Sequence, residues 1–538
     1  MSESNLPKTQ IPKTRSGPRG TPDTQHRVVF GRNPIRIDDI VALARGEARA
    51  VLDDDPGYRA RLEASRALLE RHLEQGKSPV YGVNTGVGAS VGNAIPPDLI
   101  GQLGASLPRM HGVGTGRILD DEEAAAVVCA RLASLARGHS AVRTELIERL
   151  CLLLEHRVLP RIPAEGSVGA SGDLTPLSYV AAALAGEREV SVSGQLTTAR
   201  EALLELGVEP LALGPRDSLA LMNGTSMMTG LACLAFSRAQ AMAPLAATIT
   251  AMVSEAIRGN PQHFDARIFA LKPHRGSVRA ATWIREHLQP GAGRPALRLQ
   301  DRYSVRCAPH VIGVLLDGLD SMREILEIEL NGVNDNPLFD PESGAVLHGG
   351  NFYGGHVCFA MDSLKSAVAG VADLLDRQLS ILCSPDTSGG LPENLVPGVE
   401  PERLVNHGFK AMQIAASALA AEAAKLTMPA AAFSRSTESH NQDKVSMGSI
   451  AARDCLRILE LTESVCAILA LAAAQAVDLR GLDSCCPRSI ALRDCLRAEI
   501  PMLTVDRRQD RDIERVVQLH RGGALPVPSP ADDQPRSR

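Results

Sequence analysis

The second half of the chain contains long segments in which apolar residues occur on nearly every side of a helix. These segments are residues 218–257, 311–330, 359–382, 404–428 and 445–479. Helices of this length that lack a full polar face must be covered all round, by one another or by other subunits. The pattern therefore predicts a bundle of long helices that is completed by oligomerisation.

The first half has a more mixed pattern. The acidic run at residues 120–123 begins one predicted helix that ends before Gly138, and a second is predicted from about residue 143 to residue 158. Earlier residues form loops with short strands. We expect a mainly α fold in which a mixed region, residues 27–220, precedes a helical body, residues 221–521. The polar ends, residues 1–26 and 522–538, are predicted to be disordered tails.

Composition and charge narrow the class of protein. Of the 538 residues, 44% are hydrophobic and 22% are charged, which is typical of a soluble globular protein. The net charge of -5 provides no basic field for nucleic acid, and no apolar run is long enough to span a membrane. The eleven cysteines are scattered without Cys-x-x-Cys pairs and are expected to be reduced, which favours a cytoplasmic protein. Phosphate-loop and His-Glu-x-x-His motifs are missing, so neither a nucleotide nor a metal is expected.

Three of the five tyrosines lie in polar surroundings with glycines or charges nearby: Tyr81, Tyr303 and Tyr353. The glycines around Tyr81 suit a lid that presents a phenol to a substrate. Arg306 follows Tyr303 by one helical turn, where its planar guanidinium could clamp a carboxylate or could form an ion pair within the chain. Each tyrosine could equally be a half-buried ring with a satisfied hydroxyl. These alternatives stay open at this point.

Amides, carboxylates and glycines also gather beside apolar segments. Asn223 in "LMNGTS" and the segment "ESHNQD" at residues 438–443 would lose water there and would need partners, although a bend and a helix cap are equally good explanations. The glycine-rich segment "EGSVGASGDLTPL", residues 165–177, could be a flexible link or a phosphate cradle. It follows no convincing strand of a βαβ unit, which disfavours a nucleotide site.

Nine motifs occur in a consistent order between residues 80 and 480. They are "YGVNTGVG", "RMHGVGTG", "LARGHSAVR", "GSVGASGDLTPLS", "LALMNGTS", "QDRYSVRC", "NDNPL", "HGGNFYG" and "HNQDKVSMG". With them the chain resembles the histidine, phenylalanine and tyrosine ammonia-lyases and the related aminomutases, and its pattern is most similar to bacterial tyrosine ammonia-lyases. The resemblance implies a fumarase/aspartase-like bundle of long helices and a homotetramer with shared active sites, in agreement with the apolar helices.

The resemblance also implies a prosthetic group. In this family an internal Ala-Ser-Gly segment cyclises and dehydrates autocatalytically to 4-methylideneimidazol-5-one (MIO), which corresponds here to Ala170, Ser171 and Gly172. No standard side chain is a good electrophile, and removing ammonia from an unactivated amino acid requires one. Glycine leaves its nitrogen unhindered for the cyclisation, and serine supplies the hydroxyl that is lost. Neither a metal nor a nucleotide is implied.

Further roles follow from matched motif positions. Tyr81 resembles the lid tyrosine that removes the β-proton, and a phenol with a pKa near 10 needs help from positive potential for that task. Tyr303 matches the second loop tyrosine, and Arg306 matches the carboxylate clamp. The remaining matched positions are polar groups around the prosthetic ring and substrate, and an aromatic wall: Asn223, Gln300, Glu438 and Phe352.

The substrate is predicted from three positions. In the histidine ammonia-lyases that this chain resembles, a glutamate stands at the position of Gln442. The resemblance therefore disfavours histidine as the substrate. Met110 and His111 match the pair that reads the ring, and a histidine there can hydrogen-bond a phenolic hydroxyl. We therefore expect L-tyrosine as substrate, with 4-coumarate and ammonia as products. Val87 and His310 depart from the pattern of many members, which have an aromatic residue and a glutamine at these positions, so a pocket of different shape is expected.

Several alternatives remain open from sequence alone. A phenylalanine ammonia-lyase, which gives cinnamate, is one alternative within the family. A tyrosine or phenylalanine 2,3-aminomutase would use the same prosthetic group and return the ammonia at the β-carbon, because the outcome depends on how long the lid retains the intermediates. A helical scaffold without catalysis is the alternative from another class.

Overall fold

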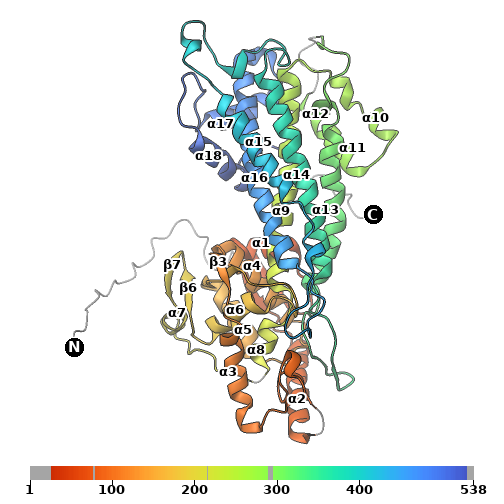
Figure 1. Cartoon of the computed structure of the whole chain (residues 1–538), viewed down its shortest axis with the longest axis vertical. Helices are drawn as coiled ribbons and strands as arrows, with labels where there is room; N and C mark the ends of the chain where they lie inside the picture. The colour runs from red at the N-terminus through yellow and green to blue at the C-terminus, as the bar shows by residue number, and fades with distance from the viewer. Residues whose placement is uncertain (1–25, 77–78, 215, 289–294, 530–538) are drawn as a thin grey trace, which may run out of the picture.

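The computed structural model describes residues 26–76, 79–214, 216–288 and 295–529. Figure 1 shows an elongated molecule with a body of long helices at one end and a smaller mixed region at the other. The mixed region contains β1 (His26–Phe30), α1 (Ile37–Ala44), β2 (Ala48–Leu52), α2 (Pro56–Gln75), α3 (Ile100–Met110), β3 (Thr115–Ile118), α4 (Asp121–Leu135), α5 (Thr144–Glu155), β4 (Val158–Pro160), β5 (Pro163–Glu165), α6 (Leu174–Leu184), β6 (Glu189–Val192), β7 (Gln195–Thr198), α7 (Ala199–Glu205) and α8 (Asp217–Met222).

The helical body follows. It contains α9 (Ser226–Ala256), α10 (Ala266–Ala270), α11 (Arg275–His287), α12 (Tyr303–Arg306), α13 (Ala308–Asn331), β8 (Leu338–Asp340), β9 (Ala345–Leu347), α14 (Gly355–Cys383), α15 (Lys410–Lys425), α16 (Gly448–Arg480), α17 (Pro487–Arg497) and α18 (Asp510–Arg521). The predicted fold class, mainly α with a mixed N-terminal region, is confirmed. The strands form small sheets: β1 pairs in parallel with β2, and β3 with β5, β4 with β6, β6 with β7 and β8 with β9 pair antiparallel.

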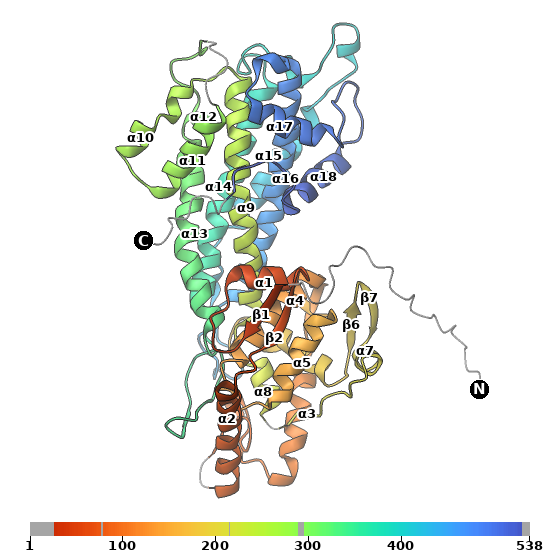
Figure 2. The same cartoon turned by 180° about the vertical axis from the view of Figure 1, so that it is seen from behind.

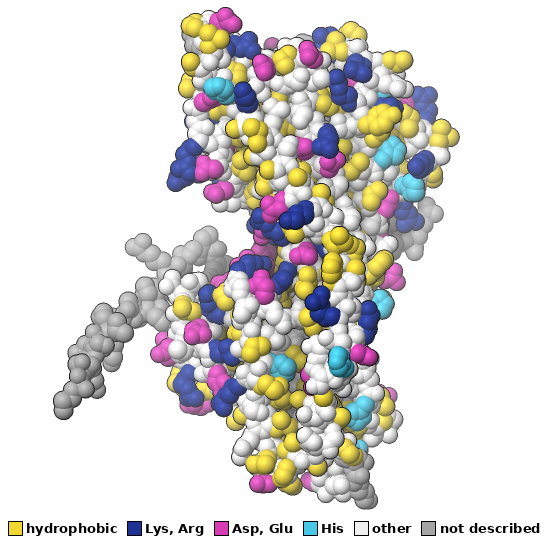
Figure 3. Space-filling view, viewed as in Figure 1, with side chains coloured by type: hydrophobic (Ala, Val, Ile, Leu, Met, Phe, Trp, Pro, Cys, Tyr) yellow, Lys and Arg dark blue, Asp and Glu magenta, His cyan; other side chains and the backbone are white. Residues whose placement is uncertain are grey.

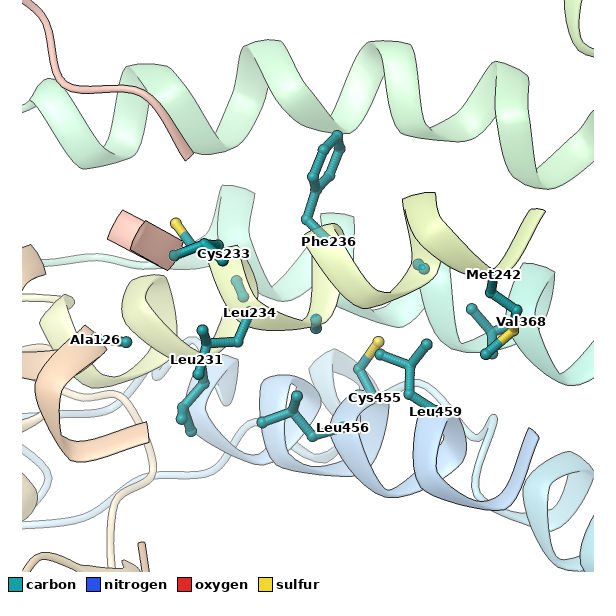
Figure 4. Close-up of a cluster of buried hydrophobic side chains, with 14 of the residues drawn as sticks. Ala126, Leu231, Cys233, Leu234, Phe236, Met242, Val368, Cys455, Leu456 and Leu459 are labelled. Atoms are coloured by element: carbon teal, nitrogen blue, oxygen red, sulfur yellow. The ribbon is translucent and has the colours of Figure 1, made fainter. Parts of the chain in front are cut away.

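The core of the body lies between α9, α14 and α16. Figure 4 shows Leu231 of α9 near Leu456 of α16, and Val368 of α14 beside Met242 at the other end of the cluster. All four side chains are buried. Phe236 of α9 points to the opposite side, where the Arg323 guanidinium of α13 lies 4.7 Å from its ring centre. Apolar residues on every side of α9 are thus covered within the chain.

The mixed region is joined to the body by close backbone contact. A Cβ atom built on Gly230 of α9 would lie 2.7 Å from the backbone of Ala126 in α4, so no larger residue fits between the two helices. Such an approach of two backbones needs glycine at the crossing. Figure 2 shows α4 and the start of α9 in adjacent positions from the opposite side. The site described below is built where these two helices meet.

The helix boundaries test the sequence predictions. A reciprocal cap begins α4: the Glu123 backbone N–H donates to the Asp120 carboxylate at 2.8 Å, and the Asp120 backbone N–H donates to the Glu123 carboxylate at 3.0 Å. The prediction of a helix at the acidic run is confirmed. The second helix is shorter than expected, because Val158 pairs with Val192 in a sheet. The segment predicted as one helix over residues 218–257 is broken at Asn223.

The structure describes only part of the two predicted disordered tails. Residues 1–25 and 530–538 lie outside the described residues. Residues 522–529 differ from the prediction of a disordered tail, because Leu525 is buried and the Cys495 thiol donates to the Ala524 carbonyl at 3.6 Å.

The described residues contain neither a membrane-spanning helix nor a cluster of metal ligands. No helix among these residues is long and apolar enough to cross a membrane. No group of three or more histidine, cysteine, aspartate or glutamate side chains in the same residues could hold a metal ion. Cysteines of the body are mostly buried, and burial raises the pKa of the Cys233 thiol to about 12.

Candidate active site

The glycine-rich loop between β5 and α6 reverses direction at Ser171. Ala170 and Gly172 face each other as an isolated antiparallel bridge, and a parallel bridge joins Gly172 to Gly224. Gly172 has a φ of +68°, and a Cβ atom at this position would lie 2.1 Å from the Gly224 carbonyl oxygen. Both the backbone conformation and the lack of space therefore require glycine. The sequence segment that could have been a flexible link is a tightly held turn.

Asp173 anchors the end of this loop. Its buried carboxylate accepts hydrogen bonds from the Met228 backbone N–H at 2.9 Å, from the Ser167 hydroxyl at 3.1 Å and from the Ser449 hydroxyl. Its own backbone N–H donates to the Gly224 carbonyl at 2.7 Å. Burial raises the pKa of the Asp173 carboxyl, and the hydrogen bonds oppose that rise. The loop is thereby fixed to the first turn of α9 and to the first turn of α16.

The other side of the loop is fixed by the residues before α16. The Val168 carbonyl accepts from the Met447 backbone N–H at 3.0 Å, and the Gly169 carbonyl accepts from the Ser446 backbone N–H at 3.1 Å and from the Ser446 hydroxyl at 3.0 Å. These bonds satisfy the carbonyls that precede the turn. The loop is consequently held from both sides, with Ser171 between the two anchors.

A cavity of about 790 Å³ opens in front of Ser171. Its lining includes these residues predicted from the sequence: Tyr81, Met110, His111, Ala170, Ser171, Asn223, Phe352, Glu438 and Gln442. Gly172 lies behind them and is buried. Val87, which departs from the family pattern, also lines the cavity. Residues from distant parts of the chain thus converge on one turn.

Tyr81 stands on a loop at the edge of this cavity. Its hydroxyl accepts a hydrogen bond from the Gly88 backbone N–H at 2.8 Å. Burial raises the pKa of Tyr81 above its ordinary value of 10.0, and the negative charge of Glu438 raises it further. The sequence prediction that a positive group assists this phenol is not met by the charges acting on Tyr81 within the described chain.

A strained segment brings Gln442 to the loop. Glu438, Ser439 and His440 have successive φ values of +49°, +53° and +62°, a left-handed run that side chains other than glycine rarely adopt. The Glu438 carboxylate accepts from the Ala89 backbone N–H at 3.0 Å, which ties this segment to the loop of Tyr81. Two residues after this left-handed run, the Gln442 amide nitrogen donates to the Ser171 hydroxyl at 3.4 Å.

The C-terminal end of α3 supplies the far wall of the cavity. Met110 is the last residue of this helix and His111 follows it directly, and both line the cavity. His111 is half-buried, and burial lowers the pKa of its imidazole below 6.5. The ring is therefore neutral at neutral pH, with one nitrogen that donates and one that accepts.

Asn223 leaves an acceptor in the cavity wall without a partner. Its amide nitrogen donates to the Asn336 carbonyl at 2.9 Å. Its side-chain oxygen is buried and has no hydrogen-bond partner among the described residues. A buried acceptor of this kind costs free energy unless something donates to it. The position fits a donor on a bound molecule or on a modified loop.

Gln300, Tyr303 and Arg306 lie elsewhere. They belong to α12 and the segment before it, which Figure 1 places at the end of the body remote from α3 and α8, and none of them lines the cavity. Tyr303 is 72% exposed, and the Arg306 guanidinium lies 4.6 Å from its ring centre. The second departure, His310, packs at 5.3 Å against Phe269 in the same part of the body. The resemblance places these three residues in the same site as the cavity residues, but within one chain the two groups lie far apart.

A family model described as aromatic amino acid lyase matches residues 35–498. The chain belongs to the aromatic amino acid lyase family. It is accordingly an enzyme of the carbon–nitrogen lyase class. The family resemblance stated from the motifs is confirmed, and the scaffold without catalysis is excluded.

Members of the aromatic amino acid lyase family with different names are similar to this chain. A MIO-dependent tyrosine 2,3-aminomutase of Streptomyces globisporus is 39% identical over 91% of this chain and 96% of its own length. A tyrosine ammonia-lyase of Cupriavidus metallidurans is 37% identical over 91% of this chain and 95% of its own length. The crystal structure of a histidine ammonia-lyase from Trypanosoma cruzi has a TM-score of 0.85 and 32% identity, covering 93% of this chain and 94% of that one. These relatives share one family but differ in the substrate and the reaction that their names give.

Other residues of this aromatic amino acid lyase line the cavity without having been singled out from the sequence. Leu103, Ser106 and Leu107 stand one or two turns before Met110 on the same helix, and Asn336 and Lys444 lie in two of the quoted motifs. The helical spacing of the α3 residues was the available signal. It becomes informative only when one face of that helix is known to meet the loop.

The residues around Ser171 fit the prosthetic group of the MIO-dependent relative. The turn brings Ala170 beside Gly172, and no side chain fits at Gly172. The Asn223 side-chain oxygen has no hydrogen-bond donor among the described residues. The group would be held by the anchors of Asp173, with its reactive carbon at the position of the Ser171 side chain, which lines the cavity. There it would supply an electrophile that accepts electrons from a substrate, so that ammonia becomes a good leaving group.

Proposed function

We propose that this enzyme removes ammonia from L-tyrosine to give 4-coumarate, with a MIO group formed autocatalytically from Ala170, Ser171 and Gly172. The observation that carries the proposal is the shared cavity of Ser171, Gln442 and a neutral His111. One end of the cavity holds the reactive segment, and the other end holds a group suited to a phenolic hydroxyl.

The proposed maturation removes two waters from the loop. The Gly172 nitrogen bonds to the Ala170 carbonyl carbon, and that carbonyl oxygen leaves as water with the protons of the Gly172 and Ser171 amides. Ser171 then loses its hydroxyl with its α-proton as the second water. The close pairing of Ala170 with Gly172 supports this chemistry, because holding two reacting groups together lowers the entropic part of the barrier.

The side chains of the cavity then act on the substrate. Tyr81 removes the β-proton as its phenolate. Its side chain lines the cavity, and its hydroxyl accepts a hydrogen bond from the Gly88 backbone N–H. Asn223 accepts a hydrogen bond at its unpaired oxygen, and Phe352 forms an apolar wall. Glu438 and Gln442 hold the segment that closes the cavity against the loop of Tyr81.

One feature disfavours histidine as the substrate, and another favours tyrosine over phenylalanine. The side chain nearest to Ser171 from the 438–442 segment is an amide, so no carboxylate from that position pairs with an imidazole ring. A neutral His111 can donate to or accept from a phenolic hydroxyl, and phenylalanine would leave this polar group unpaired. Phenylalanine, giving cinnamate, is the second candidate because the lining of α3 is otherwise largely apolar.

The proposed enzyme is a homotetramer in which each cavity receives Gln300, Tyr303 and Arg306 from other subunits. Their distance from the cavity within one chain supports this arrangement, and so does the exposed phenol of Tyr303. Exposed apolar side chains on α13, α14 and α15, such as Val314, Phe359 and Ile414, suit contact with further subunits. Figure 3 shows apolar side chains scattered over the body on the face in view. Arg306 would then clamp the substrate carboxylate.

The product assay tests the proposed function. Purified enzyme is incubated separately with tyrosine, phenylalanine and histidine, and the products are identified by chromatography and mass spectrometry. We expect 4-coumarate and ammonia in equal amounts from tyrosine, and slower conversion of phenylalanine. β-Tyrosine as the main product would replace the lyase with a 2,3-aminomutase, and preferred conversion of histidine would refute the assigned role of His111. The cytoplasmic location stays a prediction.

A further inference from the structure

Arg131 is a fully buried cation beside the reactive loop. It lies in α4, and its side chain is 0% exposed. Its hydrogen bonds within the described chain go to neutral oxygen atoms, and its Nε atom has no partner there. Burial lowers the pKa of the guanidinium to about 10, so it stays charged at neutral pH. The carboxylates of Asp335 and Asp173 attract this cation without a hydrogen bond to it. A buried cation is costly to desolvate, so the guanidinium depends strongly on its few neutral acceptors.

The acceptors of Arg131 belong to two segments that meet behind the cavity. Nη1 donates to the Asn223 backbone carbonyl at 3.0 Å, and Nη2 donates to the Asn334 backbone carbonyl at 3.0 Å. Nη2 also donates to the Ser134 hydroxyl at 3.0 Å, and this hydroxyl accepts from the Asn334 backbone N–H at 2.9 Å. The planar guanidinium, together with Ser134 one turn further along α4, therefore bridges the bend before α9 and the loop after α13.

The backbone of Gly224 lies between the Arg131 guanidinium and the reactive turn. A Cβ atom at Gly224 would be 2.1 Å from Arg131 Nη1 and 2.5 Å from the Asn334 carbonyl oxygen. A Cβ atom at Gly172 would be 2.1 Å from the Gly224 carbonyl oxygen, and this same oxygen accepts from the Asp173 backbone N–H. Close packing in such layers transmits a displacement of one layer to the next.

We infer that Arg131 is a positioning residue that presses the Asn223–Gly224 segment against Gly172 and so sets the backbone geometry in which Ala170, Ser171 and Gly172 cyclise. The inference deepens the proposed function and rests on it. Ring formation needs the Gly172 nitrogen to stay near the Ala170 carbonyl carbon, and a turn free to relax away from α4 would lose that proximity. The same clamp fixes Asn223, a residue of the cavity lining whose buried side-chain oxygen has no partner among the described residues.

Variants of Arg131 and Ser134, compared with a variant of a remote, partly buried arginine, test this role. Arg131→Met keeps much of the bulk and removes the hydrogen bonds, Arg131→Lys keeps the charge without the planar fork, and Ser134→Ala removes the shared hydroxyl. The control is Arg238→Met in α9, whose guanidinium bonds the Glu463 carboxylate at 2.9 and 2.8 Å in the body. The readouts are the fraction of molecules lighter by two waters in intact mass, the melting temperature, and kcat and KM per matured molecule.

The expected result separates maturation from stability. The matured fraction falls by more than about tenfold in Arg131→Met and less in Arg131→Lys, because a loosened reacting geometry slows ring closure. Arg238→Met lowers the melting temperature to a similar degree and matures fully. A wild-type matured fraction in Arg131→Met would overturn the inference. If that variant is insoluble, wild-type maturation in both Arg131→Lys and Ser134→Ala would overturn it. Full mass in the wild type would instead refute the proposed function, and the inference with it.

Discussion

The Gln442 amide nitrogen lies 3.4 Å from the Ser171 hydroxyl, although 271 positions separate the two residues in the chain. The contact is made by a segment that begins with the left-handed residues Glu438 to His440 and is tied to the loop of Tyr81. The side chain at residue 442 therefore faces the cavity in which we propose that the substrate binds. Its charge is expected to bear directly on which ring binds.

Replacing Gln442 with glutamate tests this relationship. We expect Gln442→Glu to gain measurable activity on histidine and to lose about tenfold in kcat/KM on tyrosine, because a carboxylate favours an imidazole and is poorly solvated beside a phenyl ring. Steady-state kinetics on both substrates measures the change. Asn441→Asp, one residue earlier and also lining the cavity, adds the same charge and serves as the matched control. Unchanged substrate preference would separate residue 442 from substrate selection.

Removing the Ser171 hydroxyl tests the prosthetic group. Ser171→Ala has no hydroxyl to lose, so we expect its intact mass to match the sequence without the loss of two waters, and its activity to fall to background. Ser464→Ala in α16, whose hydroxyl bonds the Glu460 carbonyl at 2.9 Å, should mature and act as the wild type does. A wild-type enzyme of full mass and full activity would rule out the proposed group.

Substitution of His111 tests the choice of tyrosine. His111→Phe removes the hydrogen bond to the phenolic hydroxyl, which is worth about 1–3 kcal/mol when its loss leaves a buried polar group unpaired. The ratio of kcat/KM for tyrosine to that for phenylalanine should fall by roughly 10- to 100-fold. Met110→Leu changes the neighbouring side chain without altering its polarity and should leave the ratio within a few-fold. Equal ratios in His111→Phe and the wild type would move tyrosine selection to another residue.

The raised pKa of Tyr81 predicts how activity depends on pH. The phenolate is the active form and its pKa is shifted upwards, so its population increases about tenfold per pH unit at all pH values below that pKa. We expect kcat/KM to rise as pH increases through the neutral and mildly alkaline range. A positive group from another subunit would shift this rise to lower pH without changing its sign. Tyr81→Phe should mature normally and lose activity, and a falling profile would contradict Tyr81 as the base.

Mixed tetramers test whether sites are shared between subunits. Tyr81→Phe and Arg306→Ala should each be inactive alone. When the two chains are expressed together, some sites combine an intact Tyr81 from one chain with an intact Arg306 from another, so part of the activity should return. Co-expression of two chains that both carry Tyr81→Phe and Arg306→Ala is the negative control. Absence of recovery in tetramers of verified mixed composition would show that each site is built by one chain.

Local signals in the sequence were sufficient for several helices. The acidic cap of Asp120 and Glu123 placed the start of α4, and the unbroken apolar segments placed α13, α14 and α16. Val158 was misassigned because an apolar residue before a proline fits a helix end as well as a short strand, and only the pairing with Val192 decides. Helical propensity carries no information on distant pairing partners.

The site was predictable in its parts and less so in its assembly. The motifs indicated Ser171, Tyr81 and Gln442, and the structure brings them to one cavity. Arg131 gave no signal, because an arginine in an alanine-rich helix usually reaches solvent. Its meaning depends on two backbone segments that approach α4 from far along the chain. Contacts between segments so far apart in the chain arise from tertiary structure and produce no periodic pattern in the sequence.

The closed contact between Gly172 and Gly224 has a consequence for redesign. Because backbone touches backbone there, the turn beneath Ser171 tolerates no added methyl group. The side chains open to exchange stand on the cavity walls, two of which are the α3 residues ending at His111 and the segment ending at Gln442. A library aimed at new substrates would gain most from those two walls, with every position beneath the reactive turn left as it is.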